Sequence, residues 1–438
     1  MKQHLHLPRR RFLALSLAVA ASPAWAAPRD ELAQRILVTW HRLVLELVRH
    51  TATYSPPVAS RAFGYLGVTS HEALVAGNPG LVSLAGQVNG LSPAPQPSGD
   101  TDPATALHYA LSAATKVLFG NTGPTGQRAH AALTDQLGAQ VADGLDPALH
   151  ARSAAHGTAI AEHILAWAAT DGGATIDNMG FPRDYTPGTR PQDWVPTSLV
   201  RQQQAPLLPA WGQNRLFVMP SVTACGPAAP PAYDETPGSE FHATALEVYE
   251  ISRNLTDEQK LIARFWSDDP MLSSTPAGHW ISILLDIADR DGLSAEVTAG
   301  VLAKLGIAQA DAFIACWAAK FEFNLLRPVT YIRRVIDPAW EPLLITPPFP
   351  EFPSGHSTQS GAAATVLTAI FGENFAFEDT SHEDDGFDPR GFSSFHAASE
   401  EAAMSRLYGG IHFRFGNQAG LEQGRCIGAF AAALRTEA

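Results

Sequence analysis

Alanine-rich amphipathic stretches, separated by proline- and glycine-rich loops, constrain the fold of this chain more than any other feature. Their apolar residues recur at helical spacing, and the alternation typical of strands is almost absent. The sequence therefore predicts an all-α helical bundle. Helices are expected near 29–52, 56–77, 103–118, 126–138, 147–170, 241–253, 256–268, 294–324, 355–372, 395–408 and 416–435. Thr256 and Ser294 are the expected start signals of two of them.

Two proline-rich stretches interrupt this pattern, a short one at about 91–104 and a long one at 171–240 that contains Trp194 and Trp211. A structureless run of that length inside a folded chain is expected to wrap the bundle and link its halves. The sequence accordingly predicts an N-terminal helical region at 27–240, including this connecting segment, and a C-terminal helical region at 241–438.

The N-terminus resembles a cleavable export signal over residues 1–26. Arg9-Arg10-Arg11 precedes an apolar stretch, and Ala24-Trp25-Ala26 precedes Ala27. The arginines are similar to a twin-arginine signal, although Pro8 and Ala14 depart from it, so the general secretory route stays open. Either route predicts a periplasmic or extracellular protein. Cleavage would change the formal net charge from −13 to −17, because four basic residues and no acids would be removed.

Composition favours a chain with a large core, since 45% of the 438 residues are hydrophobic and 17% are charged. No apolar run is expected to span a bilayer, so membrane insertion is not predicted. The acidic net charge disfavours nucleic acid as a partner. Cys225, Cys316 and Cys426 are widely spaced and form no metal-binding pattern. Cys316 and Cys426 are expected to be buried thiols, with one disulfide to Cys225 left open.

Three short segments of the last quarter concentrate cations, imidazoles and small donors. They are K-x6-R-P (Lys320, Arg327), P-S-G-H (Ser354, Gly355, His356) and S-R-x5-H (Arg406, His412). Arginine offers paired planar donors for the oxygens of a tetrahedral or trigonal-bipyramidal anion, and lysine adds a point charge. Glycine lets the backbone approach the anion, and serine adds a hydroxyl. Two histidines can divide between bonding the central atom and moving protons.

Local structure supports an anion site. Lys320 is expected near the end of a long helix, and the residue before Pro328 avoids helical geometry. Ser354 and Gly355 fall at the start of the helix 355–372, where free amide groups and the helix dipole favour an anion. His412 follows the Gly409-Gly410 break and can turn inward before the last helix.

Together these segments resemble the signature of the vanadium-dependent haloperoxidases and their relatives in the type 2 phosphatidic acid phosphatase superfamily. The resemblance covers about residues 30–436 and implies two four-helix-bundle-like halves. It also implies that His412 bonds vanadium, or is the phosphorylated nucleophile of a phosphatase, and that His356 is the acid–base group. Lys320, Arg327, Arg406, Ser354 and Gly355 are implied to hold the equatorial oxygens of vanadate, a site that phosphate can also occupy.

The resemblance leaves two chemistries open, because vanadate mimics the five-coordinate transition state of phosphate transfer. Trp317 and Phe349 match aromatic positions on the halide side of fungal chloroperoxidases, which favours a peroxidase over an acid phosphatase with a phosphohistidine intermediate. The implied substrates are hydrogen peroxide, a halide (bromide or iodide, with chloride as a further candidate) and a small organic acceptor. Family relatives are often dimers, which makes a homodimer an expectation. A protein that binds the anion without turnover is disfavoured by the intact His356.

Other polar residues are weaker candidates. The oxyanion-binding residues Lys320, Arg327, Ser354, Gly355, His356, Arg406 and His412 are called the cradle from here on. Asp311 is expected to orient one of the cradle arginines, with Glu400 and Glu401 as alternatives. A structural role is favoured for His279 over a place at the pocket rim. The acidic stretch at 378–388 is expected to be a solvated loop rather than a cation site.

Overall fold

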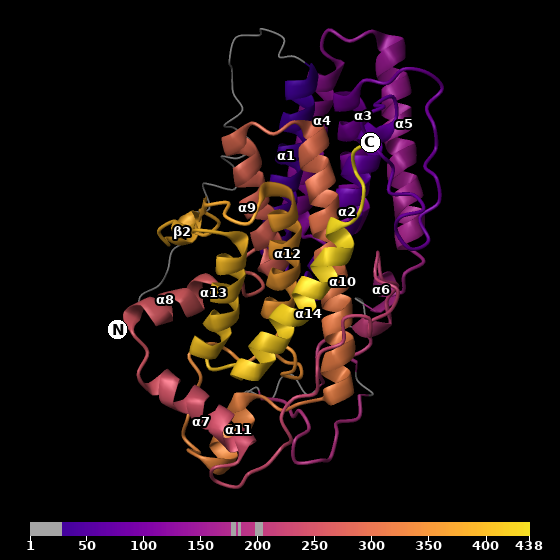
Figure 1. Ribbon diagram of the computed structural model, residues 1–438. Coiled ribbons are helices and arrows are strands. Elements are labelled where there is room, and N and C mark those ends of the chain that lie inside the picture. Colours follow the sequence, from indigo (N-terminus) through magenta and orange to yellow (C-terminus); the bar gives the residue numbers. More distant parts are fainter. Residues whose placement is uncertain (1–28, 177–180, 183–184, 198–204) are drawn as a thin grey trace.

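The computed structural model describes residues 29–176, 181–182, 185–197 and 205–438, so the predicted export signal lies outside it. Within these residues the regular secondary structure is almost entirely helical, as predicted (Figure 1). The longer helices are α1 (Arg29–Arg49), α2 (Pro56–Val75), α3 (Pro103–Leu118), α4 (Pro124–Ala142), α5 (Pro147–Ala168), α7 (Glu240–Arg253), α8 (Asp257–Phe265), α9 (Thr275–Asp291), α10 (Ala295–Phe323), α11 (Pro328–Val335), α12 (Gly355–Phe371), α13 (Phe395–Tyr408) and α14 (Arg414–Ala432). Short elements are α6 (Gly173–Ile176), η2 (Trp211–Gln213), η3 (Glu383–Asp385) and the antiparallel strands β1 (Phe377–Asp379) and β2 (Arg390–Phe392).

Most helix starts follow from local chemistry. Thr256 and Gln259 form a reciprocal capping box at α8, and Ser294 accepts from the Val297 amide at α10, as predicted. Helices α9 and α11 were not predicted. Each has a proline in its first turn, where the missing N–H costs nothing. Proline breaks the interior of a helix, but at these two positions it begins one.

Helix α10 runs down the middle of the molecule (Figure 1), and it packs against α2, α12 and α14. Its contact with α2 is close: a Cβ on Gly67 would lie 2.6 Å from the carbonyl oxygen of Leu302. By length and composition α10 could cross a membrane, contrary to the sequence expectation. Inside the protein, 94% of its most apolar window is buried, as in a core helix.

Helices α12 and α14 meet at backbone contact. A Cβ on Gly424 would lie 2.0 Å from the Thr358 carbonyl oxygen, and one on Gly428 would lie 2.6 Å from that of Ala362. Only glycine permits this approach. The contact brings the start of α12 and the turn before α14 together.

Described parts of the run 171–240 form hydrogen bonds with the C-terminal region. The Trp194 amide donates to the Asn324 carbonyl at 2.7 Å, and the Leu207 amide donates to the Pro348 carbonyl at 2.8 Å. A disulfide joins Cys225 to Cys426 on α14. The expectation of a Cys426 thiol is therefore wrong, while Cys316 is a buried free thiol. Sequence spacing could not reveal a pairing between residues 201 positions apart.

The main hydrophobic core draws side chains from both sides of residue 240, among them Trp40, Trp211, Trp280 and Leu367. At its far end the chain returns to the N-terminal helices (Figure 1), where the Ala438 amide donates to the Gly80 carbonyl at 3.0 Å. The division of the chain at residue 240 stays a prediction.

Candidate active site

The three predicted segments converge between α10, α12, α13 and α14. Lys320 lies in the last turn of α10, and Arg327 is the N-cap of α11. Ser354 is the N-cap of α12, Arg406 lies in the last turn of α13, and His412 lies in the turn before α14. All of these side chains are buried.

His412 has two defined partners. Its Nδ1 lies 2.7 Å from Oε1 of Glu351, and its Nε2 lies 3.0 Å from Nη1 of Arg327. Because arginine can only donate, Nε2 accepts and Nδ1 carries the proton. Burial, followed by Arg327 and Lys320, holds the pKa of His412 well below its usual value. The ring is therefore neutral, with its Nε2 lone pair on the Arg327 side.

Glu351 is a site residue that the sequence interpretation missed. It is fully buried and also accepts from the Phe413 amide at 3.1 Å. Burial raises its pKa to about 7, although Lys320 and Arg327 oppose this shift. A lone acid within the apolar, proline-rich run 347–353 was the available signal, because a buried carboxylate requires a partner.

The ammonium group of Lys320 forms hydrogen bonds with backbone carbonyl groups. Its Nζ donates to the carbonyl oxygens of Pro350 at 3.0 Å, Glu351 at 2.9 Å and Pro353 at 2.5 Å. These bonds use all three of its donors. Burial lowers its pKa to about 8. Lys320 thus orders residues 350–353, which lead into Ser354, and places a positive charge beside them.

Arg406 and His356 lie on the side of the site formed by the turn after α8. Nη1 of Arg406 donates to the Trp266 carbonyl at 2.7 Å. His356 forms a hydrogen bond with the Ser267 backbone, and burial, followed by Arg406, holds its pKa well below the usual value. Its imidazole is therefore neutral in this arrangement.

The first turn of α12 closes the site. The Ser354 hydroxyl caps the helix by accepting from the Ser357 amide at 3.4 Å. Gly355 begins the helix, and a Cβ there would lie 3.5 Å from the Trp317 ring. The N-terminus of α12, with its free amides and positive dipole end, therefore lies beside Trp317 and Lys320.

Several buried donors and acceptors of this site have no partner among the described residues. They are Nη2 of Arg327, Nε of Arg406, Nε2 of His356 and Oε2 of Glu351. Buried polar atoms are rarely left unpaired without a reason. Two guanidinium donors beside two neutral imidazoles fit an oxyanion such as vanadate or phosphate.

Trp317 and Phe349 form an aromatic wall beside these cations. Their ring centroids are 4.8 Å apart, and Lys320 Nζ lies 5.7 Å and 5.2 Å from them. Trp317 is held by a hydrogen bond from Nε1 to the Leu207 carbonyl at 3.2 Å. Both predicted aromatic residues thus border the cradle.

The predicted partners of the cradle arginines are wrong. Asp311 accepts from the amides of Phe217, Val218 and Met219 at 2.6, 2.9 and 3.0 Å, so it fastens the long irregular run to α10. Glu400 pairs with Arg425, and Glu401 pairs with Arg390. Nine residues along a helix separate Asp311 from Lys320 by more than two turns, which places it away from the cradle.

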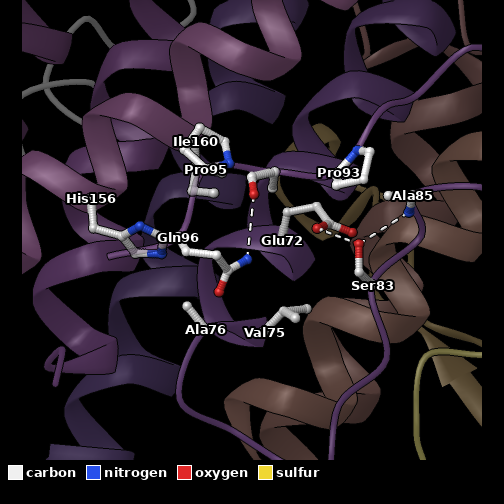
Figure 2. A pocket seen from close by; sticks show the side chains of 11 residues that line it. Glu72, Val75, Ala76, Ser83, Ala85, Pro93, Pro95, Gln96, His156 and Ile160 are labelled. Atoms are coloured by element: carbon white, nitrogen blue, oxygen red, sulfur yellow. Dashed lines mark hydrogen bonds between the residues drawn. The ribbon is translucent and has the colours of Figure 1, made fainter. Parts of the chain in front are cut away.

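A surface hollow of about 250 Å³ lies far from these residues, between α2, α5 and residues 83–96 (Figure 2). Its carboxylate, Glu72, accepts from the Ser83 hydroxyl at 2.9 Å and the Leu84 amide at 2.7 Å. None of the predicted site residues lines it. Glu72 is therefore engaged in fastening a loop.

Comparison with known proteins identifies the family of this chain. Residues 301–437 match the family described as the VCPO second helical-bundle domain. The solved structure of a bacterial vanadium-dependent iodoperoxidase is 36% identical, with a TM-score of 0.83 over 92% of this chain and 97% of that chain. A holo-type bacterial vanadium-dependent chloroperoxidase, 18% identical, has a TM-score of 0.68 over 93% and 96% of the two chains and shows the shared fold. Curated protein sequences gave no match.

The fold and cradle thus define an all-α enzyme of the helical-bundle haloperoxidase class. Because the chain is 36% identical to the iodoperoxidase over most of both chains, it belongs to the vanadium-dependent haloperoxidases.

Proposed function

We propose that this enzyme holds vanadate in the cradle and oxidises iodide or bromide with hydrogen peroxide, with chloride as a further candidate substrate. The observation that carries the proposal is the neutral His412, whose Nε2 accepts from Nη1 of Arg327, while Nη2 of Arg327 and Nε of Arg406 have no partner among the described residues. The chemistry supplied by bound vanadate is Lewis-acid activation of hydrogen peroxide without a change of oxidation state. The products would be a hypohalous-acid-type species and, with an organic acceptor, a halogenated compound.

The chain's own residues would divide the work. His412 would bond the metal through Nε2, and Glu351 would hold the ring by accepting its Nδ1 proton. Arg327 Nη2, Arg406 Nε, the Ser354 hydroxyl and the Gly355 amide would hold the oxygens. Lys320 would contribute charge while its donors order residues 350–353.

His356 is the proposed acid–base group. Its Nε2 has no protein partner among the described residues, and its low pKa keeps the ring neutral. A neutral imidazole can take a proton from hydrogen peroxide at Nε2 and return it later to the leaving oxygen. Arg406 would limit how long the ring stays charged, because it disfavours a second positive charge nearby.

The wall of Trp317 and Phe349 is the proposed halide side. The cations of Lys320 and Arg327 lie over the Phe349 ring at 5.2 Å and 4.9 Å, so an apolar surface there is backed by positive charge. Large, weakly hydrated halides suit such a surface better than chloride does. Iodide is the first choice, since the 36% identical relative is described as an iodoperoxidase.

The test compares two activities of one preparation. The protein is stripped of bound anion and reloaded with orthovanadate, and iodide and bromide oxidation by hydrogen peroxide is then measured beside hydrolysis of an aryl phosphate. We expect vanadate-dependent halide oxidation, lost in His412→Ala and retained in the matched control His163→Ala on α5. Aryl phosphate hydrolysis without halide oxidation would favour the phosphatase alternative instead.

We also propose export to the periplasm or the medium and assembly as a homodimer. The Cys225–Cys426 disulfide supports export, because such bonds persist in oxidising compartments. Fractionation of cells expressing the full chain, and light scattering of the purified enzyme, test these two points.

A further inference from the structure

Five buried or half-buried side chains form a second polar cluster outside the vanadate cradle. Asp268 lies in the turn after α8, His279 lies on α9, and Asp379, His382 and Asp385 belong to the segment that starts with β1. The acidic stretch is therefore not simply a solvated loop, because Asp379 is fully buried and His382 is 8% exposed. His279 is buried as well.

Three atoms of the cluster face one another. Asp268 Oδ1 lies 3.1 Å from Nδ1 of His279 and 3.3 Å from Nε2 of His382, and all three ligand atoms fall within 4.8 Å of each other. A tetrahedral zinc ion with bonds of about 2.0–2.2 Å separates its ligand atoms by about 3.3–3.5 Å. Two of the three separations are thus close to those of a metal site.

The outer nitrogen of each imidazole has its own carboxylate. Nε2 of His279 lies 2.7 Å from Oδ2 of Asp379, and Nδ1 of His382 lies 3.0 Å from Oδ2 of Asp385. Metal-ligating histidines commonly donate their second N–H in this way, which leaves the inner nitrogen free to bind. Both carboxylates are anchored in turn, Asp379 by the Ser381 amide at 3.0 Å and Asp385 by Arg49.

We propose that Asp268, His279 and His382 bind a divalent transition-metal ion, with Zn²⁺ as the natural occupant, and that Asp379 and Asp385 orient the two histidines. Two imidazoles and one carboxylate select this class of ion over Mg²⁺ or Ca²⁺, which prefer oxygen ligands. Without a metal the same contacts would form a hydrogen-bonded ion cluster. Asp379 and Asp268 then raise the pKa of His279 to about 10, although burial opposes this.

The position of the cluster indicates a structural role. His279 stacks on Trp266 with a centroid distance of 4.5 Å and an interplanar angle of 20°, and the Trp266 carbonyl accepts from Arg406. A bound ion would therefore fix the turn 266–268, on which both Arg406 and His356 depend. It would do so without entering the halide reaction.

Zinc binding by the purified full-length enzyme tests the proposal. After removal of metals with a chelator, the protein is titrated with Zn²⁺ alone, and bound zinc is counted by mass spectrometry beside the melting temperature. We expect one tightly bound Zn²⁺ per chain and a higher melting temperature. His382→Gln should abolish this binding, and Asp379→Asn should weaken it by about 10–100-fold, since it only orients a ligand.

Three control variants separate this site from the other histidines. His356→Gln and His412→Gln, in the vanadate cradle, and His163→Gln, on α5, should each retain the zinc. Circular dichroism of Asp379→Asn, the milder variant, checks that loss of zinc is not loss of folding. Unchanged zinc affinity in folded His382→Gln and Asp379→Asn, or no binding by the unmutated enzyme, would overturn the proposal and leave a metal-free ion cluster.

Discussion

At the scale of single residues, Glu351 and His412 act as a pair. The carboxylate accepts a hydrogen bond from Nδ1 with 2.7 Å between nitrogen and oxygen, so Nε2 is the lone-pair nitrogen, and it accepts from Arg327 in this structure. The tautomer is thus fixed by a residue that would not itself contact the anion. Gly416 makes room for this pair, because a Cβ there would lie 2.3 Å from Oε1 of Glu351.

Glu351→Gln is expected to weaken vanadate binding by about 10–100-fold, since a neutral amide orients His412 less firmly and makes Nε2 less basic. The measurement is equilibrium dialysis of the anion-free enzyme against vanadate. Glu373→Gln, an exposed glutamate beyond the end of α12, is the matched control and should bind as the unmutated enzyme does. Equal affinity in Glu351→Gln would remove Glu351 from the site.

The predicted cradle residues were found together because the chemistry of an oxyanion fixes their types and their order along the chain. Glu351 escaped notice because a buried acid is identified by its partner, and its partner lies 61 residues away. Asp311 was misassigned for the same reason, since its three backbone partners lie in a run without regular structure.

At the scale of elements, the contact between α12 and α14 positions the site. Gly420, Gly424 and Gly428 lie along one face of α14, and a Cβ on Gly420 would lie 2.7 Å from the Ser354 carbonyl oxygen. The helix that presents Ser354 and Gly355 is therefore held at backbone distance from the helix that follows His412.

Gly424→Ala is expected to destabilise the protein by about 1–3 kcal/mol, because its Cβ would overlap the Thr358 carbonyl oxygen. It should also weaken vanadate binding by separating the two helices. Gly138→Ala in α4 is the control, since a Cβ there makes only an ordinary contact at 3.5 Å and alanine favours a helix. Urea unfolding of both variants measures the difference, and equal stabilities would contradict the tight packing.

Helix positions were largely predictable because each long amphipathic stretch carries its own spacing and capping residues. Helices α9 and α11 were not predicted, and each begins with a proline in its first turn, Pro276 or Pro328, a residue that disrupts the interior of a helix but is favoured at its start. The close contact of α12 with α14 could not be predicted, because residue spacing within one helix does not show which other helix it packs against.

At the scale of the whole molecule, the Cys225–Cys426 disulfide fastens the long irregular segment to α14 across 201 residues of sequence. Removing it with the double substitution Cys225→Ser and Cys426→Ser is expected to cost about 2–4 kcal/mol of stability. A reducing agent should lower the melting temperature of the unmutated protein and leave the double variant unchanged. Identical melting curves with and without reductant would contradict a contribution from this bond.

Two buried histidines predict loss of stability in acid. Burial lowers the pKa of His41 on α1 to about 3 and that of His108 on α3 to about 4. In the unfolded chain both return to about 6.5, so below that pH the unfolded state binds more protons. Stability is then highest above pH 6.5 and falls with decreasing pH, by up to about 1.4 kcal/mol per pH unit for each histidine.

Urea unfolding between pH 7 and pH 5 measures this slope. His41→Asn should flatten it, and His163→Asn, at a partly exposed position of α5, should leave it as it is. An unchanged slope in His41→Asn would mean that other groups cause the acid sensitivity.

Helix α10 packs against α2 at Gly306, near its middle, and carries Lys320 near its end. The same helix therefore contacts the N-terminal helices and contributes a residue to the active site. The matched family region begins at residue 301, within α10. A gene fragment cut there would lose the first turns of α10 and expose the face that α2 covers. A chain that begins at residue 301 is therefore expected to be less stable than the whole protein, even though it contains every residue of the cradle.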